Sequence, residues 1–175
     1  VWPDFAARGK SGVTLAQALS HQAGLCGIEE PMRPEDWLDF GLIAARLAAS
    51  EPLWPPGTAS GYGPQTIGFI VSELLRRATG QGVSARLRAR GLEAEVYCGL
   101  EICELARVAQ MTKPPRAPTH RANSRYTEIA FLKPWSSPAG ASHEAWARAE
   151  IPASNMHATA EGLARFVHPL ALGGE

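Results

Sequence analysis

The sequence predicts a chain that is mainly α-helical. A stripe of apolar residues recurs with a helical period in the middle of the chain, and helix-capping signals precede other apolar patterns. Residues 96–100 form the one short run that favours a strand. With 45% apolar and 19% charged residues over 175 positions, the chain has enough apolar side chains to bury a core.

Residues 15–22 are predicted to form the first helix. Thr14 can cap its N-terminus, and Gln17 three positions later completes a capping box. Gly24 follows the helix and favours the left-handed backbone that ends many helices.

A second helix is predicted to begin at Pro34 and to follow apolar spacing as far as Ala49. The prolines of residues 52–57 then form a loop that no helix can cross. The strongest helix follows Pro64 and stops at Gly80. Its apolar stripe has a period of about 3.6 residues and consists of Ile67, Ile70, Val71, Leu74, Leu75 and Ala78.

The second half of the chain is less regular. A short helix is predicted over 83–90, a strand over 96–100 and a further helix over 101–111. Periodicity then fails from 112 to 152, where prolines and tryptophans are interspersed. So long an irregular stretch is typical of a lid or cleft wall, and a mobile surface loop is the alternative.

A last helix is predicted to start near Thr159, and Pro169 is expected to kink it or end it early. Its apolar stripe consists of Leu163, Phe166, Val167 and Leu170. The sequence opens without an initiator methionine or a leader pattern. We therefore expect residues 1–175 to be an internal part of a single domain in a longer protein.

Composition argues against several classes of function. Seventeen basic residues balance seventeen acidic ones, so neither nucleic acid nor an anionic membrane is an expected partner. The three cysteines do not suggest a disulfide framework, and neither they nor the scattered histidines have metal-ligand spacing. We expect no metal and no organic cofactor, and the oligomeric state stays open.

Two local motifs are weak. Gly9-Lys10-Ser11 is similar to the end of a phosphate-binding loop, but Asp4 occupies the position where that motif needs glycine. Cys26 follows a glycine-ended helix without a signal for a partner base, so it is interpreted as a small buried hydrophobe.

Three phrases occur in order along the chain. Residues 19–25 read LSHQAGL, residues 54–62 read WPPGTASGY and residues 152–165 read PASNMHATAEGLAR. In combination they resemble the serine β-lactamase-related family, and within it the carboxylesterases similar to class C β-lactamases. The resemblance covers about Trp2 to Gly174. It implies an α/β fold of the β-lactamase/transpeptidase type, of which this chain would be mainly the helical lobe.

The resemblance also implies a catalytic residue. Family members carry a serine and a lysine in S-x-x-K, a tyrosine at the head of a second helix, and a strand with K-T-G or H-x-G. The tyrosine corresponds to Tyr62. None of the lysines here has serine three residues before it, and none of the histidines has glycine two residues after it. By the family's order, both missing elements are expected to lie outside residues 1–175.

Tyr62 precedes the strongest predicted helix, where peptide dipoles favour an anion. An ordinary phenol has a pKa of about 10, so a phenolate near neutral pH requires roughly 4 kcal/mol of stabilisation. An exposed helix terminus supplies only about 0.3–1 kcal/mol. A nearby ammonium is needed as well, and the family's lysine would supply it. The alternative is a tyrosine that packs at a helix start with its hydroxyl in water.

One position departs from the penicillin-recognising relatives, which carry Tyr-x-Asn where this chain has Pro64. The missing amide favours esters over β-lactams. Among the other motif residues, His21 is expected to cap a helix end and Trp54 to pack under the proline loop or line an acyl pocket. Asn155 and His157 are expected to cap the last helix or to contact the cleft.

The resemblance implies a serine hydrolase that transfers the acyl group of small carboxylic esters and hydrolyses β-lactams weakly at most. Because S-x-x-K is absent, this chain alone is expected to be inactive. Two alternatives remain: a catalytically inactive relative that serves as a binding module, and an unrelated helical domain. We expect a cytoplasmic protein.

Overall fold

The computed structural model describes residues 1–110, 123–138 and 140–174. In these ranges the chain is mostly helical, as predicted, with one two-stranded sheet. The elements in chain order are η1 (Pro3–Ala6), α1 (Leu15–Leu19), η2 (Pro34–Leu38), α2 (Phe40–Ala49), α3 (Thr66–Thr79), α4 (Val83–Ala89), β1 (Val96–Cys98), η3 (Ile102–Arg107), α5 (Arg125–Thr127), η4 (Glu128–Leu132), α6 (His143–Arg148), β2 (Met156–Ala158) and α7 (Ala160–Ala171). Here η1 to η3 are 3₁₀ turns and η4 is a π turn.

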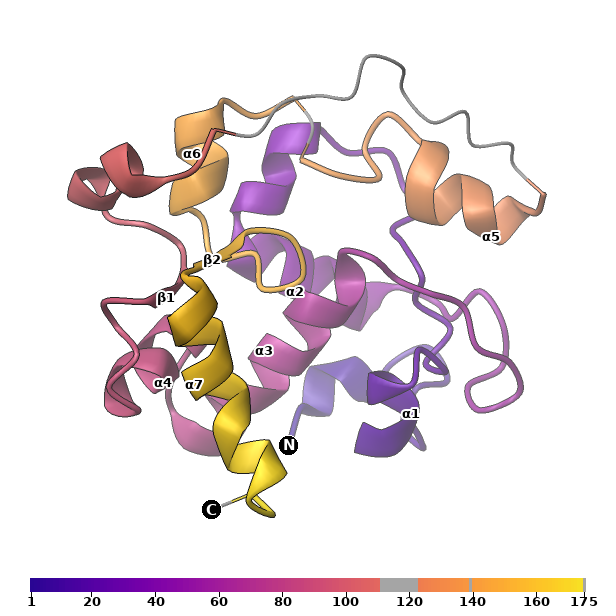
Figure 1. Ribbon diagram of the computed structural model, residues 1–175. Helices are drawn as coiled ribbons and strands as arrows, with labels where there is room; N and C mark the ends of the chain where they lie inside the picture. The colour runs from indigo at the N-terminus through magenta and orange to yellow at the C-terminus, as the bar shows by residue number, and fades with distance from the viewer. Residues whose placement is uncertain (111–122, 139, 175) are drawn as a thin grey trace.

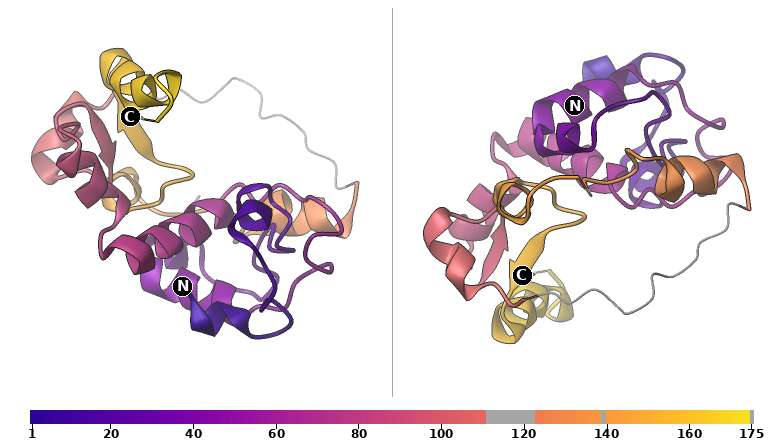
Figure 2. Two further views of the ribbon diagram at one scale, coloured as in Figure 1. Left: turned by 90° about the horizontal axis from the view of Figure 1, so that it is seen from below. Right: turned by 90° about the horizontal axis from the view of Figure 1, so that it is seen from above.

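Helix α3 lies in the middle of the molecule and contacts α1, α2 and α4 (Figure 1). The views of Figure 2 show β1, β2, α4 and α7 gathered at one end, and α1 and α2 together with the N-terminus at the other. The main apolar cluster fills the space between α2, α3 and the N-terminal segment, and a smaller one lies between α4 and β1. Helix α3 therefore connects the two ends.

Helix α1 begins as predicted but is shorter. The capping box between Thr14 and Gln17 is present in both directions. The helix ends at Leu19, and the left-handed residue that follows is His21, with φ of 59°. Gly24 is also left-handed, but it lies in the next turn. The left-handed backbone of His21 ends the helix early, and the carbonyls of residues 20–22 accept hydrogen bonds from the loop of residues 57–61.

The predicted helix from Pro34 to Ala49 is two elements, η2 and α2. Asp39 has extended backbone, with ψ of 98°, and its carboxylate accepts a hydrogen bond from the Leu42 N–H. A good N-cap thus starts a new helix within the apolar pattern. In η2, hydrogen bonds from the Arg33 side chain hold the pKa of the Asp36 carboxyl below its usual value.

Helix α3 starts at Thr66 and ends at the left-handed Gly80, as the glycine predicted. Its buried face differs from the predicted stripe, because Phe69 is fully buried, whereas Leu74 and Leu75 are half-buried and Ala78 is exposed. Phe69 packs against two other aromatic rings of the core. The sequence period thus gave the helix, but the face that α2 covers is centred on Phe69 and Ile70.

Two of the three elements predicted between residues 83 and 111 have the predicted type of secondary structure. Helix α4 lies within 83–90, and β1 lies within 96–100. Residues 101–111 hold a 3₁₀ turn instead of an α-helix. The prediction of a single strand was wrong, because β2 pairs antiparallel with β1, Tyr97 lying opposite His157. A three-residue strand is too short to show an alternating pattern.

The stretch from 112 to 152 is more regular than its periodicity indicated. Residues 112–122 and 139 lie outside the described residues. The described remainder contains α5, η4 and α6, with Ser124 and Ser142 as N-caps of α5 and α6. These turns are too short for a helical stripe, so only their caps are visible in the sequence.

Helix α7 starts where predicted, next to Thr159, whose side chain caps it by accepting from the Gly162 N–H. Its first half is held to the body, because Gly162 packs closely on the Cβ and backbone of Glu95 and Arg165 pairs with the Glu95 carboxylate at 2.7 Å. The predicted apolar stripe is largely exposed in this chain. Pro169 does not end the helix early, since it lies in the last turn before Ala171.

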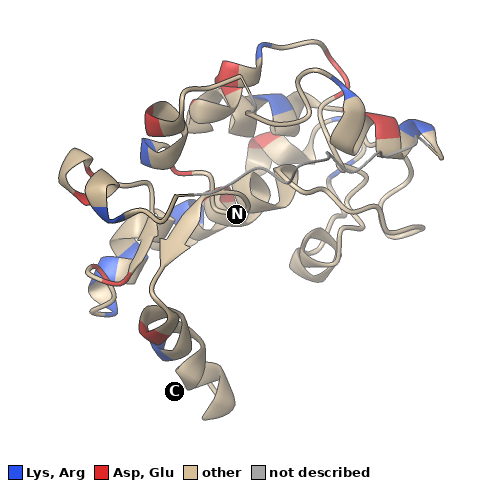
Figure 3. Ribbon diagram, turned by 45° about the horizontal axis from the view of Figure 1, so that its top comes forward, with Lys and Arg blue, Asp and Glu red and all other residues tan. Residues whose placement is uncertain are grey.

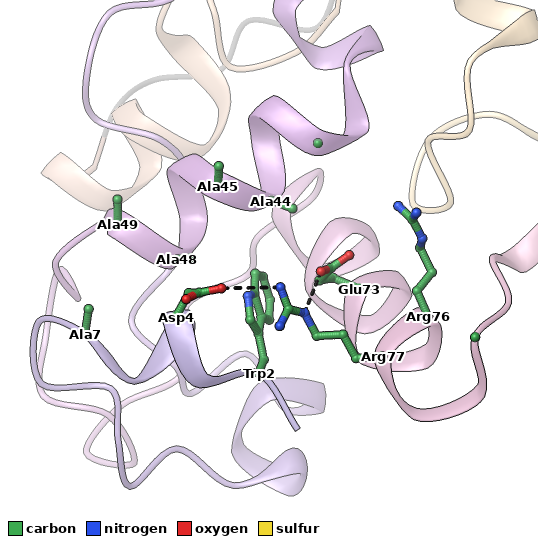
Figure 4. A pocket seen from close by; sticks show the side chains of 12 residues that line it. Trp2, Asp4, Ala7, Ala44, Ala45, Ala48, Ala49, Glu73, Arg76 and Arg77 are labelled. Atoms are coloured by element: carbon green, nitrogen blue, oxygen red, sulfur yellow. Dashed lines mark hydrogen bonds and ion pairs between the residues drawn. The ribbon is translucent and has the colours of Figure 1, made fainter.

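A cavity of about 820 Å³ lies between η1, α2 and α3 (Figure 4). Arg77 spans its wall, where it pairs with Glu73 at 2.6 Å and Asp4 at 3.5 Å and lies over the Trp2 ring. Both carboxylates offset the guanidinium charge, so this network ties the N-terminal turn to α3.

Charged residues of both signs are dispersed over the helices (Figure 3). Among the described residues, no helix combines the length and the apolar character needed to span a membrane.

The thiols differ enough for a chemical test of this fold. Burial raises the pKa of Cys26 to about 11 and that of Cys98 to about 12, whereas Cys103 is exposed. With Ellman's reagent at pH 8, we expect Cys103 to react quickly and the other two only slowly, since the thiolate is the reactive form. In urea all three should react alike. Three fast thiols in the folded chain would contradict the packing of Cys26 and Cys98.

Candidate active site

Tyr62 lies in the loop between Trp54 and α3, close to the N-terminus of that helix. Its side chain is 59% exposed and lines a cavity of about 370 Å³. An exposed phenol at a cavity is the geometry that a catalytic tyrosine requires. A hydroxyl buried in the helical core would have excluded that role.

Aromatic rings form the walls of this cavity. The Tyr62 and Phe131 rings stack with centroids 6.2 Å apart, and Trp54 meets Tyr126 edge-on at 5.0 Å. The lining residues are Cys26, Trp54, Ala59, Ser60, Gly61, Tyr62, Ser124, Tyr126, Thr127, Ala130 and Phe131. None of them is charged, so the cavity suits a neutral and largely apolar group.

Tyr126 and Phe131 also line the cavity, although the sequence did not predict them as site residues. Both come from the stretch where periodicity fails, and the π turn η4 carries Phe131 to the side of Tyr62. One feature of the sequence indicated them: residues 112–152 lack periodicity, and this stretch was interpreted as a lid or cleft wall. The described part of it, around α5 and η4, lines the cavity.

The loop that carries Tyr62 needs glycine on both sides. A Cβ on Gly61 would overlap the Trp54 ring, and a Cβ on Gly63 would overlap the Thr66 hydroxyl. Trp54 is buried, and its indole N–H donates to the Ala59 carbonyl at 2.9 Å. Trp54 therefore packs under the loop, as expected, and also lines the cavity, whose use as an acyl pocket stays a prediction.

The two lysines that the structure describes contact other groups and lie outside the Tyr62 cavity. Lys10 is buried, donates to the Ser50 carbonyl and lies 5.3 Å from the centre of the Phe5 ring. Desolvation, together with the charge of Arg8, lowers the pKa of its ammonium. Lys133 pairs with Glu128 at 2.6 Å. Neither lines the Tyr62 cavity, and Lys113 lies outside the described residues.

Cys26 lies at the cavity but is not poised as a nucleophile. Its thiol is buried, and desolvation raises its pKa to about 11. Attack by cysteine requires the thiolate, which is scarce at neutral pH for such a group. Its interpretation as a small buried residue is confirmed.

The capping roles expected of Asn155, His21 and His157 were wrong. Asn155 neither caps α7 nor reaches the cavity. It is buried, donates to the carbonyls of Trp146 and Ala149 at 2.6 Å each, and accepts from the Ile151 N–H. His21 does not cap α1 through its side chain, because its Nδ1 accepts a hydrogen bond from the Gly63 N–H at 3.2 Å.

His157 likewise does not cap α7, because it lies on β2 and Thr159 is the cap. Its ring meets Trp146 edge-on, with centroids 5.7 Å apart. It is not among the residues that line the Tyr62 cavity.

The family model described as Beta-lactamase matches residues 1–175. The chain belongs to the beta-lactamase family. That Tyr62 corresponds to the catalytic tyrosine of this family stays a prediction from the resemblance.

Relatives of this beta-lactamase family chain include esterases. The chain is 31% identical over 191 residues to "Esterase/beta-lactamase LipL" of Mycobacterium tuberculosis (strain ATCC 25618 / H37Rv). The matched region covers 99% of this chain and 44% of the relative. A crystal structure of a family VIII carboxylesterase matches with a TM-score of 0.85 and 36% identity, over 98% of this chain and 47% of that one.

A further solved structure is the novel penicillin-binding protein homolog from Caulobacter crescentus. It matches with a TM-score of 0.90 and 45% identity, over 99% of this chain and 47% of that one. The chain thus has the β-lactamase/transpeptidase-like fold in its mostly helical part, and the expected fold class is confirmed. It spans less than half the length of the relatives it matches.

Proposed function

We propose that residues 1–175 are the part of a serine hydrolase that supplies Tyr62 and one wall of the substrate cleft. The enzyme would transfer the acyl group of small carboxylic esters to water. The observation that carries this proposal is the exposed Tyr62 ring at the head of α3, in an aromatic cavity whose described lining residues carry no charge. The esterase names of two relatives support the reaction class.

The proposed reaction has two steps, with a serine and a lysine that this sequence does not contain in S-x-x-K. Tyr62, as a phenolate beside the lysine ammonium, takes the serine proton while the serine oxygen attacks the ester carbonyl. The tetrahedral intermediate collapses, and the departing alkoxide receives that proton from Tyr62. Water then attacks the acyl-serine by the same proton exchange and releases the acid.

The cavity also indicates the substrate. Rings of Trp54, Tyr126 and Phe131 would pack against an apolar acyl or alcohol group, and among the residues that the structure describes the lining offers no cation for a carboxylate. Pro64 provides no side-chain amide where penicillin-recognising relatives carry asparagine. Neutral esters are therefore the proposed substrates, with β-lactams turned over weakly at most.

The inactive relative remains as a second candidate. If the longer protein lacked the serine–lysine pair, the same aromatic cavity would only bind ligands. A cytoplasmic location remains a prediction.

Assay of the chain as given is the first test. With p-nitrophenyl butyrate, residues 1–175 should release nitrophenol at the background rate, because no serine–lysine pair is present. A hybrid enzyme, in which residues 1–175 replace the matching part of the family VIII carboxylesterase, should hydrolyse the same ester. Turnover by the isolated chain that survives Tyr62→Phe but is lost on replacement of a serine in it would overturn the assignment. A folded hybrid that binds the ester without turnover would favour the binding module.

Pro64→Asn in the hybrid enzyme separates the two substrate classes. Ester turnover should be largely unchanged, since the proline side chain has no proposed part in the chemistry. Activity on the β-lactam nitrocefin should stay equal or rise, because asparagine can contact the substrate amide. A hybrid that already prefers nitrocefin with Pro64 in place would contradict the proposed preference for esters.

A further inference from the structure

The loop that carries Tyr62 is fastened along its length to the chain just after α1. The Gly57 N–H donates to the Gln22 carbonyl at 2.9 Å, the Ser60 hydroxyl to the Ser20 carbonyl at 2.9 Å, and the Gly61 N–H to the His21 carbonyl at 3.0 Å. These bonds use backbone acceptors, so residues of many types could supply them.

The hydrogen bond closest to α3 is different, because its acceptor belongs to a side chain. The Gly63 N–H donates to Nδ1 of His21 at 3.2 Å, across 42 positions of sequence. Nδ1 can accept only in the neutral imidazole with its proton on Nε2. His21 therefore binds the residues on both sides of Tyr62, one through its carbonyl and one through its ring.

The same imidazole also touches the phenol. The rings of His21 and Tyr62 meet edge-on, with centroids 4.9 Å apart and planes at 66°. Phe131 stacks on Tyr62 at 6.2 Å. The Tyr62 ring, although 59% exposed, is thus held by the His21 ring as well as by its backbone neighbours.

His21 has left-handed backbone, a conformation that few residues with a Cβ adopt. Its φ is 59°, and among the described non-glycine residues only Arg8, with φ of 56°, shares this region. Left-handed backbone is unfavourable for a residue with a Cβ. Such strain persists only where the surrounding structure requires it. Here it aims the carbonyl at Gly61 and the imidazole at Gly63.

We propose that His21 is a positioning residue for Tyr62, which acts by holding the Gly61–Gly63 loop and the edge of the phenol in place. The catalytic meaning of this role rests on the proposed function. The placement itself does not, so the two can be tested apart.

The first test uses the chain itself and nuclear magnetic resonance. A scalar coupling across the hydrogen bond should connect the Gly63 amide nitrogen with Nδ1 of His21. In His21→Gly, which removes the acceptor and relieves the positive φ, we expect the Gly63 amide to exchange about tenfold faster. The Tyr62 amide should become more mobile. Arg8→Gly, which relieves the same kind of strain elsewhere, should change neither signal.

The second test measures kinetics in the hybrid enzyme. His21→Gly should lower kcat by about 10–10²-fold, the scale expected when a reacting group is misplaced. KM should move little. His21→Asn should restore most of kcat, because asparagine tolerates left-handed backbone and its Oδ1 can accept from Gly63. A purely structural role would instead lower the melting temperature and leave kcat of the folded fraction unchanged.

The outcomes distinguish the two proposals. Absence of the coupling in the wild-type chain, or a Gly63 amide that keeps its protection in His21→Gly, overturns the positioning role. So does a normal kcat in His21→Gly after the loop has loosened, provided that Tyr62→Phe is impaired. If Tyr62→Phe keeps a normal kcat, the proposed function fails, while the coupling still decides whether His21 holds the loop.

Discussion

Tyr62→Phe in the hybrid enzyme should lower kcat by about 10²–10⁴, the usual contribution of a general acid–base group. Phenylalanine keeps the ring that stacks on Phe131 and meets His21, so the cavity keeps its shape. Only the hydroxyl that exchanges the proton is lost. KM should therefore change little, and p-nitrophenyl butyrate kinetics measure both constants.

The matched control is Tyr126→Phe, which removes a hydroxyl from the same cavity. That hydroxyl donates weakly to the Leu53 carbonyl, at 3.3 Å, and has no proposed part in proton transfer. Its loss should leave kcat within a few-fold of the parent. Equal effects of the two substitutions, or a nearly normal kcat in Tyr62→Phe, would reduce Tyr62 to a packing residue.

Phe69→Ala should destabilise the chain by about 3–5 kcal/mol, the range for removing a buried aromatic ring. Phe69 is 0% exposed, and its ring lies 5.5 Å from that of Trp37 and 5.4 Å from that of Phe40. The cavity left behind cannot collapse easily, because α2 and α3 flank it. Urea unfolding, followed by tryptophan fluorescence, measures the loss.

Leu170→Ala serves as the control for that experiment, since Leu170 is 75% exposed on α7. We expect a change within about 0.5 kcal/mol, as for ordinary surface positions. If Phe69→Ala leaves too little folded protein, Phe69→Leu should give a smaller and measurable loss. A Phe69 variant no less stable than the Leu170 variant would mean that the core is not centred on α3.

Local signals predicted the elements that end in caps or glycines. Thr14 with Gln17, Thr159 and Gly80 each acts within a few residues, so the sequence alone locates these helix ends. The break between η2 and α2 at Asp39 was missed, because the apolar pattern continues through that position. Asp39 acts as an N-cap only because η2 and α2 pack as separate elements. Strand β2 was missed for a similar reason, since its three residues are extended only by pairing with β1.

The candidate site shows the same division. The phrases around residues 19–25 and 54–62 sufficed to assign the family and to single out Tyr62 as the candidate. They could not show that His21 binds Gly63 instead of capping a helix, because that bond joins positions 42 apart. Nor could they show that Asn155 is a buried partner of Trp146 and Ala149.

The sequence by itself therefore determined the helical class, the family and the position of the candidate tyrosine, all of which depend on residues close together in the chain. Tertiary structure alone decided which face of α3 is buried, which aromatic rings surround Tyr62 and what His21 binds. Phe131 reaches Tyr62 from a stretch without periodicity, through a π turn whose position depends on packing. Contacts between distant segments are fixed by shape and burial, and a local sequence pattern does not encode them.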